Sequence, residues 1–307
     1  METKSSNTSS FLKGCVILMR PPNLPTAAAD IIAGCAIVGV FAHLTLNFTG
    51  GLAVDMMLLV LSSILLYAGG VVLNDVFDFE IDKAERPERP IPMGTVPINS
   101  AIFLGSGLLV LGVLLSFVVQ LESGIVAIIL TATILVYDSL AKHHVFFGPL
   151  VMGSCRGLNL MLGMTIFGIP PVLFWCYSLL PIIYIAAVTL ISRGEVHGNN
   201  KKYLLFSGLL YGVVIISILT LILESEQHWL LISPFLILFI GAIFKPLVKA
   251  YSFNTPENIK KAVKAGVISL VLMNAALAAS TSEWWVGLLI ILLLPLSLFL
   301  SKRFSVT

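Results

Sequence analysis

The chain has 307 residues, of which 58% are hydrophobic and only 11% are charged, and its formal net charge is +2. Soluble domains are about 25% charged, so these proportions exclude a soluble enzyme, a disordered protein and a nucleic-acid-binding protein. The mean hydropathy of +1.01 is typical of a chain that crosses a membrane several times. We therefore expect an integral membrane protein surrounded by lipids, with no nucleic-acid partner.

Apolar stretches of about 20 residues are long enough to cross a bilayer as helices. Continuous runs of this length indicate α-helices rather than the strands of a membrane barrel. The sequence contains ten such stretches, at residues 24–46, 53–73, 98–119, 123–140, 147–168, 171–191, 203–223, 229–248, 262–280 and 284–300. Very short turns join the third stretch to the fourth and the ninth to the tenth, which predicts two helical hairpins. We predict an all-α transmembrane helix bundle that forms a single domain over residues 1–307.

The basic residues lie on one side of this predicted bundle. All 18 lysine and arginine residues except Arg156 lie in, or beside, its polar segments on that side. These segments are the N-terminus, residues 74–97, 141–146, 192–202 and 249–261, and the C-terminus. Loops rich in Lys and Arg face the cytoplasm. We therefore expect the N-terminus and the long polar loops to be cytoplasmic, in a bacterial cytoplasmic membrane.

An acidic segment follows the second predicted span. Its residues Asp75, Asp78 and Asp82 are spaced i, i+3, i+7, which places three carboxylates on one face of a helix. Like charges at this spacing repel, and a hard divalent cation such as Mg²⁺ with oxygen ligands would offset the repulsion. An alternative is a solvated acidic helix end, paired with Lys83, Arg86 and Arg89. The spacing alone leaves both interpretations open.

The pattern Asn-Asp-x-x-Asp-x-x-x-Asp, followed by Arg-Pro, resembles the first aspartate-rich motif of the UbiA superfamily of intramembrane prenyltransferases. The matching residues are Asn74, Asp75, Asp78, Asp82, Arg86, Arg89 and Pro90. Two weaker matches accompany this motif. The segment Arg20-Pro-Pro-Asn23 resembles the family's Arg-Pro-x-Asn entry motif. Tyr137-Asp138, followed by Lys142, is similar to the family's Tyr-x-x-x-Lys element.

The resemblance implies a UbiA-like helix bundle with polar cytoplasmic loops over a central cavity. Family members usually have nine spans, so we expect nine or ten spans here. It implies Mg²⁺-dependent transfer of a prenyl group from a prenyl diphosphate to a lipophilic acceptor within the membrane. The implied metal ligands are Asp75, Asp78, Asp82 and Glu195, which with Lys142 form the expected catalytic set. The implied substrate-binding residues are Arg20, Asn23, Asn74, Tyr137, Arg156, Asn159, Arg193 and His197.

The loop after the sixth predicted span departs from the family pattern. UbiA proteins usually carry a second aspartate-rich motif there, whereas residues 192–202 contain no Asp and Glu195 is their only carboxylate. His197 and Arg193 are the other candidate contacts. A basic, glycine-rich connector is the alternative interpretation of this loop. The departure also supports a second function, that of a non-catalytic UbiA-like protein that binds or translocates a hydrophobic metabolite.

Arg156 and Asn159 lie within the fifth predicted span, on one helix face. A charge inside a membrane is costly, and it faces the protein interior or a wet cavity. Because guanidinium groups suit phosphate, Arg156 is a candidate ligand contact. The alternative is a buried ion pair with a carboxylate such as Asp30 or Asp138.

Overall fold

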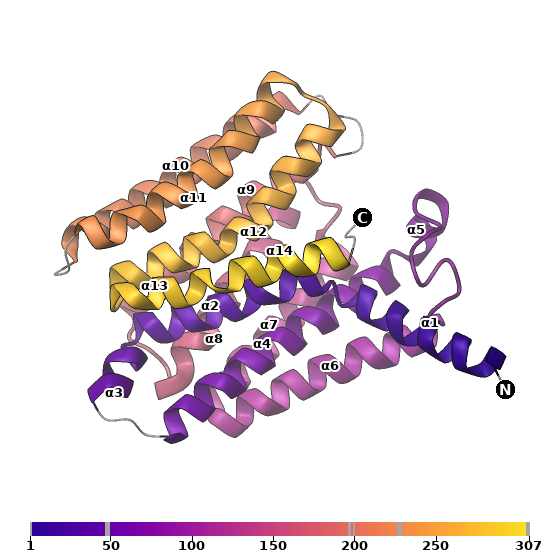
Figure 1. Cartoon of the computed structure of the whole chain (residues 1–307), viewed down its shortest axis with the longest axis horizontal. Helices are drawn as coiled ribbons and strands as arrows, with labels where there is room; N and C mark the ends of the chain where they lie inside the picture. Colours follow the sequence, from indigo (N-terminus) through magenta and orange to yellow (C-terminus); the bar gives the residue numbers. More distant parts are fainter. Residues whose placement is uncertain (1, 47–49, 196–197, 199, 226–228, 305–307) are drawn as a thin grey trace.

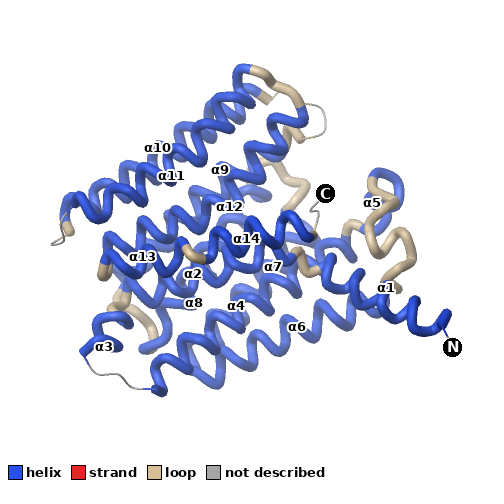
Figure 2. The backbone as a smooth tube through the Cα atoms, viewed as in Figure 1, coloured by secondary structure: helices blue, strands red, loops and turns tan. Residues whose placement is uncertain are grey.

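The structure, a computed structural model, describes residues 2–46, 50–195, 198, 200–225 and 229–304. Throughout these ranges the chain consists of helices and loops and contains no strand (Figure 2). The predicted all-α class is therefore confirmed. Long helices lie side by side and form a bundle, and α1 projects from one end of it (Figure 1).

The helices follow the predicted apolar stretches closely. In chain order they are α1 (Glu2–Leu18), α2 (Leu24–Ile37), α3 (Val40–Leu46), α4 (Gly50–Phe77), α5 (Phe79–Glu85), α6 (Ile98–Val119), α7 (Leu121–Val136), α8 (Phe147–Met164), α9 (Leu179–Ser192), α10 (Lys201–Glu224), α11 (Trp229–Ser252), α12 (Pro256–Thr281), α13 (Trp284–Ile291) and α14 (Leu293–Arg303). A π-helical turn, η2 (Tyr137–Ala141), continues α7, and short 3₁₀ turns precede α2, follow α8 and precede α9. The two predicted hairpins are present, as α6 with α7 and as α12 with α13.

Nine helical segments in the described part of the chain are long and apolar enough to cross a membrane, and a bent pair raises this number to ten. The bent pair includes the first predicted span, which is not one straight helix as we expected. Its direction changes by 68° between Ile37 and Val40. Gly39 lies at this break with a φ of 81°, a conformation that glycine adopts without strain. The N-terminal helix α1 was not predicted, because its sequence is polar.

Helices α2 and α8 approach one another closely in the centre of the bundle. A Cβ atom on Gly34 would lie 2.3 Å from the carbonyl oxygen of Leu160, and one on Gly163 would lie 2.4 Å from that of Ile31. Small residues allow such contact between membrane helices, where packing rather than exclusion of water drives association. This contact brings the polar residues of α2 and α8 together beside the central cavity.

Candidate active site

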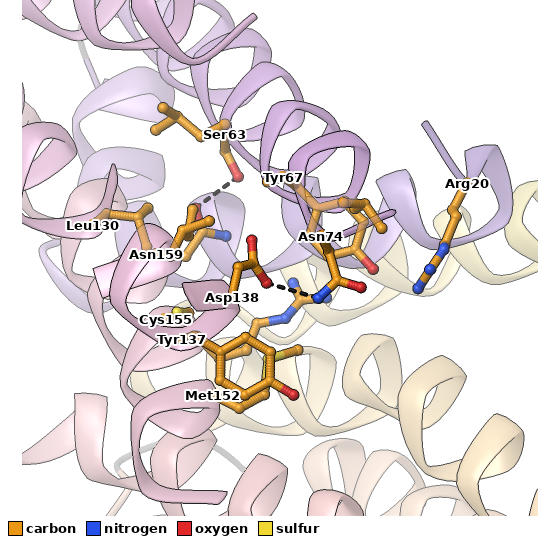
Figure 3. Close-up of a pocket in the computed structure, with 15 residues that line it drawn as sticks. Arg20, Ser63, Tyr67, Asn74, Leu130, Tyr137, Asp138, Met152, Cys155 and Asn159 are labelled. Atoms are coloured by element: carbon orange, nitrogen blue, oxygen red, sulfur yellow. Dashed lines mark hydrogen bonds between the residues drawn. The ribbon is translucent and has the colours of Figure 1, made fainter. Parts of the chain in front are cut away.

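A cavity of about 170 Å³ opens between α4, α7 and α8 (Figure 3). Its lining consists of Arg20, Ser63, Leu66, Tyr67, Gly70, Val71, Asn74, Leu130, Ile134, Tyr137, Asp138, Met152, Cys155, Arg156 and Asn159. The lining combines charged and amide side chains with apolar ones, among them Leu66, Leu130 and Ile134. A second cavity of about 340 Å³ lies beside α1, and Arg20 lines both cavities.

The aspartate-rich segment adjoins the part of the central cavity that Arg20, Asn74 and Tyr137 line, which we call its mouth, and basic side chains hold this segment. Asp75 accepts hydrogen bonds from Arg20 at 2.7 Å and from Arg89 at 3.2 Å, and Arg89 also binds Asp82 at 2.5 Å. Asp75 and Asp82 are both buried. Arg89 thereby joins the end of α4 to α5. Arg20 reaches its position from a left-handed backbone conformation, with φ 47° and ψ 64°, which costs about 1–2 kcal/mol for a residue with a Cβ.

Lys142 pairs with Asp78, and their side-chain atoms lie 2.5 Å apart. Asp78 lies between α4 and α5, so the three aspartates do not belong to one uninterrupted helix. Backbone hydrogen bonds of helical spacing nevertheless continue through the break, from Asp78 N–H to the Asn74 oxygen and from Asp82 N–H to the Asp78 oxygen. The π-turn closes with a hydrogen bond from the backbone N–H of Lys142 to the backbone carbonyl oxygen of Tyr137. Such π-turns are frequent at functional sites, and this one carries Tyr137 and Asp138 into the cavity wall.

Asp138 is buried and lines the same cavity, and its two carboxylate oxygens differ. Oδ1 accepts a hydrogen bond from the Asn74 side-chain amide at 2.8 Å. Oδ2 is buried and has no hydrogen-bond partner among the described residues. Figure 3 shows one oxygen turned to Asn74 and the other turned away from it. An unpartnered buried acceptor costs about 1–3 kcal/mol, so this oxygen is a candidate ligand contact.

Other polar side chains of the cavity lining belong to an internally paired network. Arg156 donates to Asp30 at 2.9 Å, Asn159 donates to the same oxygen at 2.9 Å, and Asn274 donates to the other oxygen at 2.6 Å. The Arg156 guanidinium also stacks over the Tyr67 ring, 4.9 Å from its centroid. The structure thus shows the buried Arg156–Asp30 pair, one of the two alternatives drawn from the sequence, while both Arg156 and Asn159 still line the cavity.

The loop after α9 approaches the aspartate-rich segment. Arg193 donates to the backbone oxygen of His144 at 2.7 Å. Burial raises the pKa of the Glu195 carboxyl above its usual value, and the nearby charges of Arg86 and Lys260 act in the opposite direction. Glu195 therefore lies within electrostatic reach of Arg86, the residue that follows α5. His197 lies outside the described residues.

Comparison with known proteins identifies the family. The model of the UbiA prenyltransferase family matches residues 32–263, which is most of the chain. This chain belongs to the UbiA prenyltransferase family. The resemblance drawn from the sequence motifs is thus confirmed.

The relatives of this chain include digeranylgeranylglyceryl phosphate synthases. The protein from Methanococcoides burtonii is 36% identical over 104 residues, which are 34% of this chain and 37% of that synthase. The chain thus matches little more than a third of that relative's length. A solved structure of digeranylgeranylglyceryl phosphate synthase is 25% identical, with a TM-score of 0.64 over 88% of this chain and 98% of the other. A UbiA homologue from Archaeoglobus fulgidus, bound to DMAPP and Mg²⁺, has the same fold, with a TM-score of 0.63, 14% identity, and coverage of 88% and 99%.

The aspartate-rich segment of this UbiA protein has the right chemistry for Mg²⁺, because carboxylate oxygens are hard ligands. In the described part of the chain, however, no three His, Cys, Asp or Glu side chains are grouped closely enough to hold a metal ion. Each aspartate of the segment is paired with Arg or Lys instead. The carboxylates of the segment are therefore suitable Mg²⁺ ligands. In this structure, however, their negative charge is balanced by Arg and Lys side chains of the protein itself.

The structure brings together most, but not all, of the residues singled out in the sequence. Arg20, Asn74 and Tyr137 line the central cavity. Asp75, Asp78, Asp82 and Lys142 lie beside them in a set of ion pairs that also includes Arg20 and Arg89. Asn23 lies at the start of α2, where its backbone oxygen accepts from Thr26. From the sequence, Arg89 was expected only as a motif residue and a possible partner of the acidic segment, and Asp138 only as a motif neighbour and a possible partner of Arg156. An acidic residue at the end of an apolar stretch was the available signal for Asp138, whereas nothing in the sequence showed that Arg89 would join two aspartates.

Proposed function

We propose that this protein transfers a prenyl group from a prenyl diphosphate to a lipophilic acceptor inside the membrane. The observation that carries the proposal is the arrangement of the central cavity in a UbiA family member. A cluster of paired acidic and basic side chains adjoins its mouth through Arg20, and much of the remaining lining is apolar. This arrangement suits a donor with a highly charged head and a hydrocarbon tail.

The charged head of the donor would lie among Asp75, Asp78 and Asp82 on one side and Arg20 and Lys142 on the other. Bound Mg²⁺ would neutralise charge on the departing diphosphate. We infer that the Lys142 ammonium and the Arg20 guanidinium turn from their carboxylate partners to the diphosphate, since charge-assisted hydrogen bonds to phosphate are strong. Glu195 and Arg193 are further candidates, from the facing loop. The A. fulgidus homologue, which is bound to DMAPP and Mg²⁺, supports this ligand class.

As the diphosphate departs, the C1 carbon of the prenyl group becomes electrophilic. The cavity must then exclude water, which would otherwise react with this carbon. Apolar residues such as Leu66, Leu130 and Ile134 line the cavity beside the site of the diphosphate. They would hold the isoprenoid tail and keep water from the reacting carbon. The name of the M. burtonii relative suggests an acceptor class as well, a prenylated glyceryl phosphate with a free hydroxyl group.

We also propose that the mouth of the cavity faces the cytoplasm. The basic residues at this end of the bundle support that orientation.

The second candidate is a carrier that binds a hydrophobic metabolite without transferring it. The observation in its favour is the loop at 192–202, which offers one carboxylate where the family usually has several. In a carrier, burial of apolar surface would supply the affinity, and binding would not depend on a metal.

The deciding experiment measures binding of geranyl diphosphate to the purified protein, and transfer to a monoalkyl glyceryl phosphate, with Mg²⁺ and with a chelator. We expect both donor binding and prenyl transfer to require Mg²⁺. Asp78→Asn should abolish metal-dependent binding, because an amide supplies only a dipole where a carboxylate supplies a full charge. Glu195→Gln should lower turnover. Asp55→Asn makes the same chemical change near the other end of α4 and is the matched control.

Chelator-insensitive binding that survives Asp78→Asn, with no transfer product from the wild-type protein, would favour the carrier. Product formation that stops with chelator would reject it.

A further inference from the structure

The buried oxygen of Asp138 is a polar group inside the cavity that the proposed donor site does not use. Asn74 holds Oδ1 at 2.8 Å, which fixes the carboxylate plane, while Oδ2 has no partner in the described part of the chain. Only 3% of Asp138 is exposed. Figure 3 shows the side chain projecting into the cavity between Asn74 and Asn159. An acceptor-only oxygen in this position calls for a ligand that donates a hydrogen bond.

The surroundings of Asp138 narrow the chemical class of that ligand. Lys142 and Arg20 lie close enough to interact with it electrostatically, and so do Asp78 and the neighbouring Cys155. Lys142 and Arg20 are themselves paired with Asp78 and Asp75. The carboxylate repels an anionic diphosphate. A neutral hydroxyl group is therefore the ligand that satisfies Oδ2 without adding charge.

Two other polar side chains of the cavity, Arg156 and Asn159, already have partners within the protein. Arg156 donates hydrogen bonds to Asp30 and to Thr26. Asn159 accepts from Ser63 and donates to Asp30, so both ends of its amide are occupied. Among the described residues that line the cavity, Asp138 is thus the carboxylate placed to meet an acceptor in the apolar part.

We propose that Asp138 binds the hydroxyl group of the acceptor and takes its proton. The inference rests on the proposed function. The acceptor oxygen forms a bond to C1 of the prenyl group, while the C1–O bond of the donor breaks and its electron pair leaves with the diphosphate. The O–H bond of the acceptor breaks and the proton passes to Oδ2 of Asp138. The product is an ether, and the acceptor class is a lipid alcohol.

The test compares two acceptors with the full-length protein in detergent. One is a monoalkyl glyceryl phosphate with a free hydroxyl, and the other is its analogue with a thiol in place of that hydroxyl. Geranyl diphosphate with Mg²⁺ is the donor, at pH 9. A thiol is several pKa units more acidic than an alcohol, so a substantial fraction is thiolate at this pH and its attack depends far less on a base, whereas an alcohol needs one.

We expect Asp138→Asn, which keeps the side-chain size, to lower transfer to the hydroxyl acceptor by about 100-fold or more. Transfer to the thiol acceptor and the dissociation constant of the donor should stay close to those of the wild type. Asp138→Glu keeps a carboxylate and should recover part of the hydroxyl activity, which keeps the test decisive if Asp138→Asn fails to fold. Asp55→Asn is the matched control and should leave both reactions unchanged.

Equal losses with both acceptors would overturn the inference, because they indicate a role in shape or donor binding. A fully active Asp138→Asn, or an Asp138→Glu no better than a non-ionisable variant, would overturn it as well. A wild-type protein that transfers to neither acceptor would overturn the proposed function and this inference together. An active wild type with an unaffected Asp138→Asn would overturn this inference alone.

Discussion

At the scale of single residues, pairing of charges organises the mouth of the cavity. The sequence singled out Asp75, Asp78 and Asp82, but it left open whether a metal or neighbouring cations would offset their repulsion. In this structure Arg89 and Lys142 perform that role, and Arg89 contacts two aspartates at once. Arg89 lies seven residues beyond Asp82, so this contact depends on how the loop after α5 folds back.

Arg89→Gln should destabilise the protein by about 3 kcal/mol. The change leaves the buried Asp82 carboxylate without its cationic partner, and breaking one side of a buried pair costs about 3–5 kcal/mol; the estimate lies at the low end because Arg20 still neutralises Asp75. The measurement is the midpoint of thermal unfolding in detergent. Lys261→Met, which breaks an exposed pair with Glu257, is the control and should have little effect. Equal midpoints for Arg89→Gln and the wild type would show that Asp82 does not depend on this partner.

At the scale of helices, the contact between α2 and α8 decides where the polar residues meet. Gly34 and Gly163 allow each helix to approach the backbone of the other, and the Asp30 network then bridges them. The hydrophobic pattern predicted both helices but not this contact. Apolar membrane helices look alike on all faces in a single sequence, so helix pairing cannot be derived from periodicity.

Gly34→Ala should lower stability by about 1–3 kcal/mol, the usual cost of overpacking a well-packed interior. The added methyl group would meet the Leu160 oxygen at 2.3 Å, and helix backbone cannot move aside easily. Gly212→Ala in α10 is the control, since nothing lies within 4 Å of a Cβ at that position. There the change should leave stability unchanged or raise it by about 0.5–1 kcal/mol. The midpoint of thermal unfolding should therefore fall for Gly34→Ala and should rise or stay unchanged for Gly212→Ala. A Gly34→Ala protein as stable as the wild type would contradict the close packing.

At the scale of the whole molecule, the basic residues and the candidate site lie at the same end of the bundle. Loops 74–97, 141–146 and 192–202 approach one another there, as the contacts of Lys142 with Asp78 and of Arg193 with His144 show. Charge bias alone predicted that these loops share a side. Their meeting over one cavity depends on the order in which α4, α7, α8 and α9 pack.

Labelling of single cysteines should test the orientation. In a variant lacking the four native cysteines, Lys202→Cys and Glu224→Cys place exposed thiols at the two ends of α10. This helix has 24 residues, so it is about 36 Å long and spans the bilayer core of about 30 Å. A membrane-impermeant maleimide applied to intact cells should label position 224 and leave position 202 unlabelled until the cells are opened. The reverse labelling pattern would show that the orientation is opposite to the one proposed. Labelling of both positions from outside would show that α10 does not span the membrane.

The sequence by itself determined the helical class, the position of nearly every span, the family and the aspartate-rich motif. These are properties of local composition and spacing, and the bilayer forces long apolar runs to become helices because their backbone groups must bond internally. Only the tertiary structure decided that Arg156 pairs with Asp30, that Arg89 joins Asp75 to Asp82, and that Asp138 lies in the cavity beside Asn74. These partners are separated by up to 126 residues. Their contact depends on which helix faces meet, and a hydrophobic pattern that is nearly uniform around each helix does not encode that choice.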